Sequence, residues 1–227
     1  QAKKEPGDSW QVWEFDLEGG ELNQVTDTDS DCAEPAYLPD GRIVYCRFVP
    51  DYSGYHVLET SKSDGSETQQ ITFGPVDFAS PIVLMDGRIL AFAKERHPKP
   101  GKTQLMVMRP DGTKIELFYE SDQENEIVAD AGLYQTADDR IVFSEKALGE
   151  EVEAQWISVD YNHPMDSRVR YEAEIINDLK HVVYAPRPRP KKLPSAVNPE
   201  VETDLLVCMD ANLSENDPHE THDRSVK

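Results

Sequence analysis

The sequence has few cysteines and no long apolar run. Its three cysteines, Cys32, Cys46 and Cys208, form no Cys-x-x-Cys pair and no haem-attachment motif, which excludes a disulfide framework. Cys32 and Cys46 are closest along the chain and are the candidates for a single bridge, so the redox compartment stays open. No apolar segment approaches the roughly 20 residues that a membrane-spanning helix requires, and we predict no membrane span.

Basic residues are scarce relative to acidic ones. The chain of 227 residues carries 44 Asp and Glu against 23 Lys and Arg, a formal net charge of -21. Such a surface repels phosphate groups, which argues against nucleic acid as a partner. The simplest interpretation of such an excess of acidic residues is that it keeps the protein soluble. The alternative is that it attracts a cationic partner or a metal ion.

Motifs that carry chemistry are also missing. The sequence has no Gly-x-Ser-x-Gly elbow and no Gly-rich phosphate loop, and its acidic residues are too numerous for one general acid-base pair to stand out. We therefore predict no catalytic residue and no cofactor. Residues 27–31 alternate Asp with hydroxyl residues like the start of a calcium loop, but Cys32 stands where that loop needs Gly, which favours an ordinary surface loop.

The weak metal candidates are His219, His222 and Asp223. A His-x-x-His pair beside carboxylates suits a zinc ion. No apolar residue surrounds this segment to order such ligands, so a polar tail is the better interpretation. We predict no metal site.

The sequence does contain a repeated hairpin. Residues 35–46 and 81–92 share a short strand, an Asp-Gly-Arg turn and an apolar strand, and residues 133–143 are a looser copy. Asp-Gly supplies the positive φ that a tight hairpin turn requires. Asp139 replaces this glycine in the third copy, and Asp tolerates the left-handed region well enough to keep the turn.

A second hairpin alternates with the first. Its copies are residues 13–26, 57–72 and 105–118, and the first two end in Val25-Thr26 and Ile71-Thr72. Two hairpins per unit make four strands per unit, which predicts an all-β fold, a β-propeller of four-stranded blades. A β-sandwich is the main rival, but the fixed repeat period favours the propeller. The aromatic residues in strand patterns are then expected between blades: Trp13, Phe92, Phe143 and Trp156.

These hairpins resemble the repeat of TolB-like propellers. That repeat has an apolar strand, a Pro-Asp-Gly-Arg turn and a second apolar strand, followed by a strand that ends in an Asp-Gly turn. The matching turns are Pro39-Asp40-Gly41-Arg42, Met85-Asp86-Gly87-Arg88, Leu17-Glu18-Gly19-Gly20, Ser63-Asp64-Gly65 and Pro110-Asp111-Gly112. The resemblance covers residues 10 to about 160. It implies the fold and not a function, because such blades serve many proteins.

The proline-rich run that follows does not match a blade. Residues 184–195 are similar to a segment of bacterial proteins related to the middle domain of the hydrazine synthase α-subunit, which continues into a strand, here 204–210. Without a haem-attachment motif, no haem ligand or redox activity follows from this resemblance. We interpret residues 186–194 as a stiff strap across the propeller, its basic residues Arg187, Arg189, Lys191 and Lys192 lying against an acidic molecule. The alternative is a polyproline ligand for an aromatic groove.

We expect about four blades, with two arrangements left open. Residues 10–26 supply two outer strands, and strands near 174–176 and 181–185 would complete their blade and close a small ring. The alternative, which we favour, is an excerpt of a larger ring, because the closed form leaves residues 200–213 over. The domain boundaries expected are a polar lead-in at 1–9, blades at 10–165, a degenerate blade with the strap at 166–213 and a polar tail at 214–227.

The sequence thus favours a non-catalytic propeller module that acts as a binding or scaffold surface in a bacterial envelope or secreted protein, periplasmic or outside the cell. Its partner would be a protein, a small molecule or other domains of a parent protein. The alternative is an accessory propeller portion of a larger multidomain enzyme, hydrazine synthase α-like or peptidase-like, whose catalytic parts lie elsewhere.

Overall fold

The structure is a computed structural model that describes residues 8–50, 54–74, 76–96, 99–129, 132–149, 153–171 and 188–197. The chain divides into two compact units, Gln1–Ala196 and Val197–Lys227, and every described residue except Val197 belongs to the first. Within the described ranges the regular elements are strands, and no helix is long and apolar enough to cross a bilayer.

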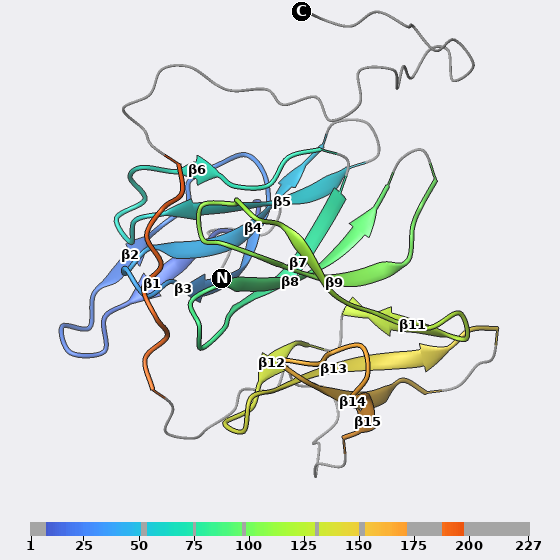
Figure 1. Ribbon diagram of the computed structural model, residues 1–227. Coiled ribbons are helices and arrows are strands. Elements are labelled where there is room, and N and C mark those ends of the chain that lie inside the picture. Colours follow the sequence, from blue (N-terminus) through green and yellow to red (C-terminus); the bar gives the residue numbers. More distant parts are fainter. Residues whose placement is uncertain are drawn as a thin grey trace, which may run out of the picture. The chain divides into compact units, whose positions relative to one another are not determined.

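The strands pair in antiparallel sheets that follow chain order (Figure 1). The first sheet is a hairpin of β1 (Trp13–Phe15) and β2 (Leu22–Gln24). Three larger sheets, which we call blades 1 to 3, come after it. Blade 1 contains β3 (Cys32–Tyr37), β4 (Ile43–Val49), β5 (Tyr55–Ser61) and β6 (Gln69–Gln70). Blade 2 contains β7 (Val76–Val83), β8 (Ile89–Glu95), β9 (Thr103–Met108) and β10 (Glu116–Glu120). Blade 3 contains β11 (Asn125–Val128), β12 (Tyr134–Gln135), β13 (Arg140–Ala147), β14 (Gln155–Asp160) and β15 (Val169–Arg170).

The hydrophobic core lies between successive sheets, in three separate clusters. Alternate residues of β8 show why: Ile89 and Ala91 face blade 1, whereas Leu90 and Phe92 face blade 3. Because successive side chains of a strand point to opposite faces, a sheet packed on both faces needs an almost continuous apolar strand. Two sheets that shared one core would not need this, so the predicted propeller is confirmed over the sandwich. Phe92 and Phe143 are core residues as predicted, whereas Trp13 and Trp156 are only partly buried.

The first strand of every blade is irregular at the same place. The β3–β4 register shifts at Glu34-Pro35, and the β7–β8 register shifts at Ser80-Pro81. Glu34 and Ser80 both have positive φ, and Ser80 donates its backbone N–H and its hydroxyl to the Glu34 carboxylate, the latter at 3.0 Å. In blade 3 the irregularity separates β11 from β12, and both pair with β13. The blade predicted to have four strands therefore has five.

Turn glycines allow close contact between neighbouring sheets. Gly65 and Gly112 both have positive φ in the turn between the third and fourth strands. A Cβ built on Gly65 would lie 2.6 Å from the Val25 carbonyl oxygen of the preceding sheet, and one on Gly112 would lie 1.9 Å from that of Ile71. The threonines that follow these two carbonyls accept backbone N–H groups at 2.9 and 2.8 Å, which explains the repeated Val-Thr and Ile-Thr endings.

The cysteines, the third Asp turn and the strands expected beyond residue 171 have different outcomes. Cys32 and Cys46 are free thiols, because Cys32 lies in the cluster before blade 1 and Cys46 in the cluster after it, on opposite faces of the sheet. Asp139 has a φ of 58°, which confirms that it takes the place of the turn glycine. The strands expected near 174–176, 181–185 and 204–210 lie outside the described residues, as does the polar tail.

The contact of Gly112 with Ile71 makes a stability prediction. We expect Gly112→Ala to lower the free energy of unfolding by about 3 kcal/mol, because the new Cβ both strains the backbone and displaces a carbonyl of the preceding blade. Gly20→Ala is the matched control: Gly20 has a φ of 70° in the corresponding turn of the β1–β2 hairpin, with no atom within 4 Å of a built Cβ. It should cost about 1 kcal/mol, the conformational strain alone. Urea unfolding measures both, and equal losses would contradict the stacking contact.

Candidate functional site

The candidate site lies where the turns of adjacent blades meet. In each blade the turn between the first two strands and the turn between the third and fourth strands lie at the same end of the sheet. We call this end the turn face. It includes the hairpin turns at 38–42, 62–66, 84–88 and 109–113, each closed by backbone hydrogen bonds.

Residues 188–196, which we call the strap, run across the turn face without regular secondary structure (Figure 1). The Lys191 N–H donates to the Met85 carbonyl oxygen at 3.1 Å, and the Arg189 guanidinium donates to the Pro39 carbonyl oxygen at 3.2 Å. The Arg109 guanidinium donates to the Pro194 carbonyl oxygen. The strap therefore spans turns of two blades.

Gly87 lets the strap approach its turn closely. A Cβ built on Gly87 would lie 1.9 Å from the Lys191 carbonyl oxygen, although Gly41, at the same position of blade 1 and with the same φ of 90°, has no atom within 4 Å. The two turns have the same Asp-Gly-Arg sequence, so the contact depends on what lies against each turn and not on the turn itself.

Asp111 holds the far end of the strap. Its Oδ2 accepts hydrogen bonds from the Ser195 hydroxyl at 3.0 Å and from the Ala196 N–H, while its Oδ1 accepts from the Thr113 N–H. Partial burial raises the pKa of Asp111, but the hydrogen bonds from Thr113, Ala196 and Ser195 outweigh it and bring the pKa down to about 2. In the folded protein, Asp111 is therefore ionised at neutral pH.

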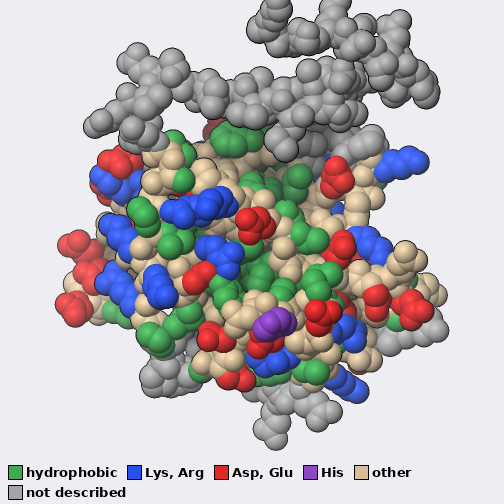
Figure 2. Space-filling view, in the orientation of Figure 1, with side chains coloured by type: hydrophobic (Ala, Val, Ile, Leu, Met, Phe, Trp, Pro, Cys, Tyr) green, Lys and Arg blue, Asp and Glu red, His purple; other side chains and the backbone are tan. Residues whose placement is uncertain are grey.

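Ion pairs between the basic side chains of the strap and carboxylates are not what attaches it. Figure 2 shows Lys and Arg side chains gathered on the side where the strap runs in Figure 1, interspersed with Asp and Glu. Within the described residues, Lys191 and Lys192 are exposed and no strap residue forms an ion pair with a carboxylate. The strap is attached instead by hydrogen bonds to backbone carbonyl oxygens, including one from the Arg189 guanidinium, and by the hydrogen bonds that Asp111 accepts. Arg187 lies outside the described residues.

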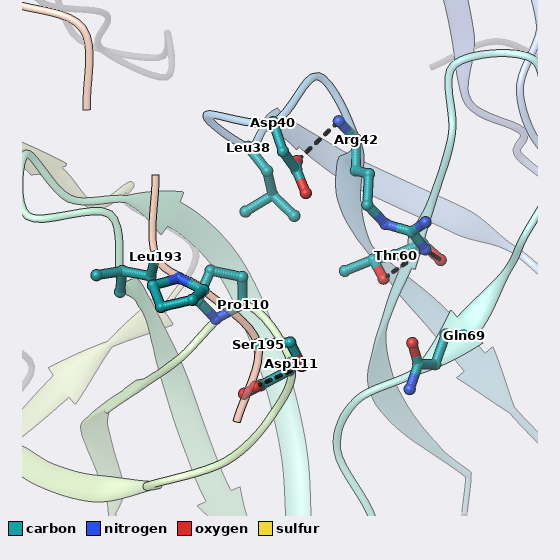
Figure 3. A pocket seen from close by; sticks show the side chains of 10 residues that line it. Leu38, Asp40, Arg42, Thr60, Gln69, Pro110, Asp111, Leu193 and Ser195 are labelled. Carbon is teal, nitrogen blue, oxygen red and sulfur yellow. Dashed lines mark hydrogen bonds between the residues drawn. The ribbon is translucent and has the colours of Figure 1, made fainter. Parts of the chain in front are cut away.

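A cavity of about 200 Å³ opens between blade 1, blade 2 and the strap (Figure 3). Its walls are residues of blade 1 (Leu38, Asp40, Arg42, Thr60, Gln69), of blade 2 (Pro110, Asp111) and of the strap (Leu193, Pro194, Ser195). In Figure 3 Leu38 and Asp40 lie on one side, with Leu193 and Pro110 opposite them. Six of these ten residues are polar or charged, and Leu38, Pro110, Leu193 and Pro194 supply the apolar part of the wall. Small-ligand sites generally combine an apolar wall with polar groups that fix the ligand's orientation, and here the polar groups are the larger share.

Arg42 is held in place at the edge of this cavity. Its Nη2 donates to the Thr60 hydroxyl at 3.1 Å and to the Glu67 carbonyl oxygen at 2.7 Å. Asp40 accepts the Arg42 backbone N–H through Oδ1 at 3.1 Å, and within the described residues its Oδ2 accepts no hydrogen bond. The cavity thus presents one available carboxylate oxygen beside a fixed guanidinium.

Two other carboxylates are buried between blades but fully partnered. Glu145 accepts from the hydroxyls of Tyr119 and Ser121 at 2.9 and 2.6 Å and from Arg168 Nε at 2.8 Å. Glu59 accepts from Tyr45 and Arg47 in the same manner. Glu145 connects two sheets, because Tyr119 belongs to blade 2 and Glu145 itself to blade 3. Glu59 and its two partners all belong to blade 1. Neither carboxylate lines the cavity.

The residues singled out from the sequence lie elsewhere. His219, His222 and Asp223 are outside the described residues. Within the described ranges, no group of three or more His, Cys, Asp or Glu side chains is placed to hold a metal ion. In the loop 27–31, Asp31 accepts the Trp10 N–H and the carbonyls of Thr28 and Ser30 accept from Gln11, so its oxygens tie the chain together.

This arrangement of sheets is that of a TolB-like β-propeller. Solved structures similar to it include hydrazine synthase of Kuenenia stuttgartiensis, with 18% identity and a TM-score of 0.57 over 72% of this chain and 30% of that one. A protein described as TolB of Agrobacterium tumefaciens aligns with 17% identity and a TM-score of 0.56 over 74% of this chain and 58% of its own. TolB of Acinetobacter baumannii aligns with 18% identity and a TM-score of 0.53, over 72% and 38%.

These likenesses confirm the resemblance at the level of the fold. The chain spans less than two thirds of each of these three proteins. No protein-family model matches the sequence, and no curated protein is significantly similar to it.

Gly87 gives a direct test of the strap. We expect Gly87→Ala to detach the strap from blade 2, because the new Cβ would overlap the Lys191 carbonyl. Trypsin should then cleave after Lys191 and Lys192 at least about tenfold faster, since cleavage follows local opening. Gly41→Ala introduces the same strain into the equivalent turn and should leave the cleavage rate unchanged. Equal cleavage of the two variants would contradict the contact.

Asp111 makes attachment of the strap depend on pH. A carboxylate whose folded pKa of about 2 lies below its ordinary value of 3.8 stabilises the contact fully above that value and loses it as the pH falls toward 2. We therefore expect the amide NMR signals of Ser195 and Ala196 to stay constant down to about pH 4 and to move between pH 4 and 2. In Asp111→Asn they should resemble those of the detached strap at every pH. A midpoint at or above pH 4 would refute this assignment.

Proposed function

We propose that this chain is a non-catalytic β-propeller module that binds a partner through its turn face. The observation that carries the proposal is the cavity between blades 1 and 2, which stays open although the strap lies across the same turns. Supporting it, the polar atoms around the cavity are hydrogen-bond groups fixed by turns and are suited to recognition. The buried carboxylates, which would be the candidates for chemistry, are already occupied by their neighbours.

We place this module in the envelope of a bacterium or in a secreted bacterial protein, where it would act as a binding or scaffold surface. Support comes from the similar propellers named above, all of which are bacterial proteins. The acidic surface fits a partner that is neutral or basic better than one that is anionic.

A second candidate is an accessory propeller portion of a larger multidomain enzyme. The observation that favours it is the unequal coverage of the hydrazine synthase alignment, 72% of this chain against 30% of that one. In that case the turn face would hold a neighbouring domain. A parent reading frame that contained no further domain would remove this candidate.

The binding role is tested with a set of chemically diverse fragments followed by protein NMR. We expect hits to perturb the amides of Arg42, Thr60 and Gln69 at the cavity, and Gln69→Trp to abolish these perturbations by filling the entrance. Glu116→Trp is the control, because Glu116 is the exposed residue at the same position of β10 that Gln69 has in β6. Hits that bind only elsewhere, or none at all, would overturn the proposal.

A further inference from the structure

The turn face contains two equivalent crevices between blades, and one of them is filled. The first lies between turn 38–42 of blade 1 and turn 109–113 of blade 2, where the cavity is. The second lies between turn 84–88 of blade 2 and the segment after β14 in blade 3. Leu38, Asp40 and Arg42 of the first correspond to Leu84, Asp86 and Arg88 of the second, through the repeated turn sequence.

Tyr161 fills the second crevice. Its hydroxyl donates to Asp86 Oδ2 and accepts from Arg88, and the Arg88 guanidinium lies 5.7 Å from the centre of its ring. The ring also packs against Phe118, at 6.1 Å between centroids. An aromatic ring and its hydroxyl thus satisfy both the apolar wall and the charged turn.

Pro110 stands at the position of Tyr161 in the first crevice. Ile89 pairs with Met108 in blade 2 and Ile141 pairs with Val159 in blade 3, so Pro110 and Tyr161 each lie two residues beyond equivalent pairs. Proline has neither the reach nor the hydroxyl of tyrosine. The space that Tyr161 occupies in one repeat is therefore vacant in the other, beside the equivalent aspartate.

We infer that the cavity between blades 1 and 2 binds a hydroxyl-bearing aromatic ring, which takes the place that Tyr161 has in the neighbouring repeat. The hydroxyl would donate to Asp40 Oδ2, and the ring would lie between Leu38, Pro110 and Leu193. A cavity of about 200 Å³ has room for one ring, since cavities of about 150 Å³ hold benzene. The inference rests on the proposed function and names its ligand class.

The guanidinium groups of Arg42 and Arg88 have different hydrogen-bond partners, and a difference between the two repeats explains this. Thr60 offers it a hydroxyl where blade 2 has Val107, because both residues pair with equivalent positions of the second strand. Arg42 is consequently turned to Thr60 and Glu67, whereas Arg88 turns to Tyr161. The carboxylate of Asp40 is therefore the group that selects a hydroxyl, and the guanidinium forms a wall.

The test compares p-cresol with toluene, which differ only in the hydroxyl, by NMR titration of the wild-type protein. We expect p-cresol to perturb the cavity amides and toluene to bind at least tenfold more weakly. Asp40→Asn should weaken p-cresol about tenfold, and Pro110→Tyr should abolish its binding by supplying the ring from the chain. Asp64→Asn is the control, because Asp64 closes the same kind of turn without lining the cavity.

A reciprocal variant keeps the test independent of any one substitution. Tyr161→Ala opens the second crevice, and we expect p-cresol to bind there as well and to raise the Tm of that variant more than that of the wild type. A capped Gly-Tyr-Gly peptide distinguishes the source of the ring. Binding equal to that of p-cresol indicates a tyrosine of a partner protein, and exclusion of the peptide indicates a free phenol.

The outcomes separate this inference from the function it rests on. If toluene binds as well as p-cresol, or if Pro110→Tyr folds and still binds p-cresol, the ligand class is wrong, although fragments at the cavity would still support a binding role. If neither p-cresol nor any fragment perturbs the cavity amides, both proposals fail.

Discussion

The structure depends on the burial of each sheet between its two neighbours. A four-stranded sheet with apolar side chains on both faces cannot fold alone in water, and the cores here lie between sheets and not within them. Stacking then requires close approach at the turns, where Gly112 lies against the Ile71 carbonyl. The crevices of the turn face are a by-product of this geometry, because each one forms wherever two blades meet.

The fold was predictable because its signals are local and repeated. A turn that needs positive φ selects Asp-Gly within four residues, and the strands beside it need apolar residues at successive positions. The threonines after Val25 and Ile71 recur because each caps a backbone N–H of its own sheet. The break between β11 and β12 was not predictable, because no proline marks it as Pro35 and Pro81 mark the corresponding bulges.

The candidate site was only partly predictable. The prolines of the sequence predicted the strap, but the attachment was expected from attraction between opposite charges. The observed contacts are hydrogen bonds to backbone carbonyl oxygens and to Asp111, which lies 84 residues from Ser195. Asp111 sits in an Asp-Gly turn like Asp40, Asp64 and Asp86, and nothing in that local sequence shows which turn the strap will meet. Contacts between segments this far apart depend on the assembled blades, which a local pattern does not describe.

Differences between equivalent positions of a repeat distinguish a role in stability from a role in binding. Tyr161 buries its ring and pairs its hydroxyl with Asp86, so the second crevice stabilises the stack. Pro110 leaves the first crevice open, so the walls of this crevice lack the packing contacts that a larger side chain would make. Both crevices are made by the same stacking, so the fold does not require either state. An occupant from outside the chain would gain the packing contacts that this crevice lacks, and by binding only the folded state it would stabilise the stack.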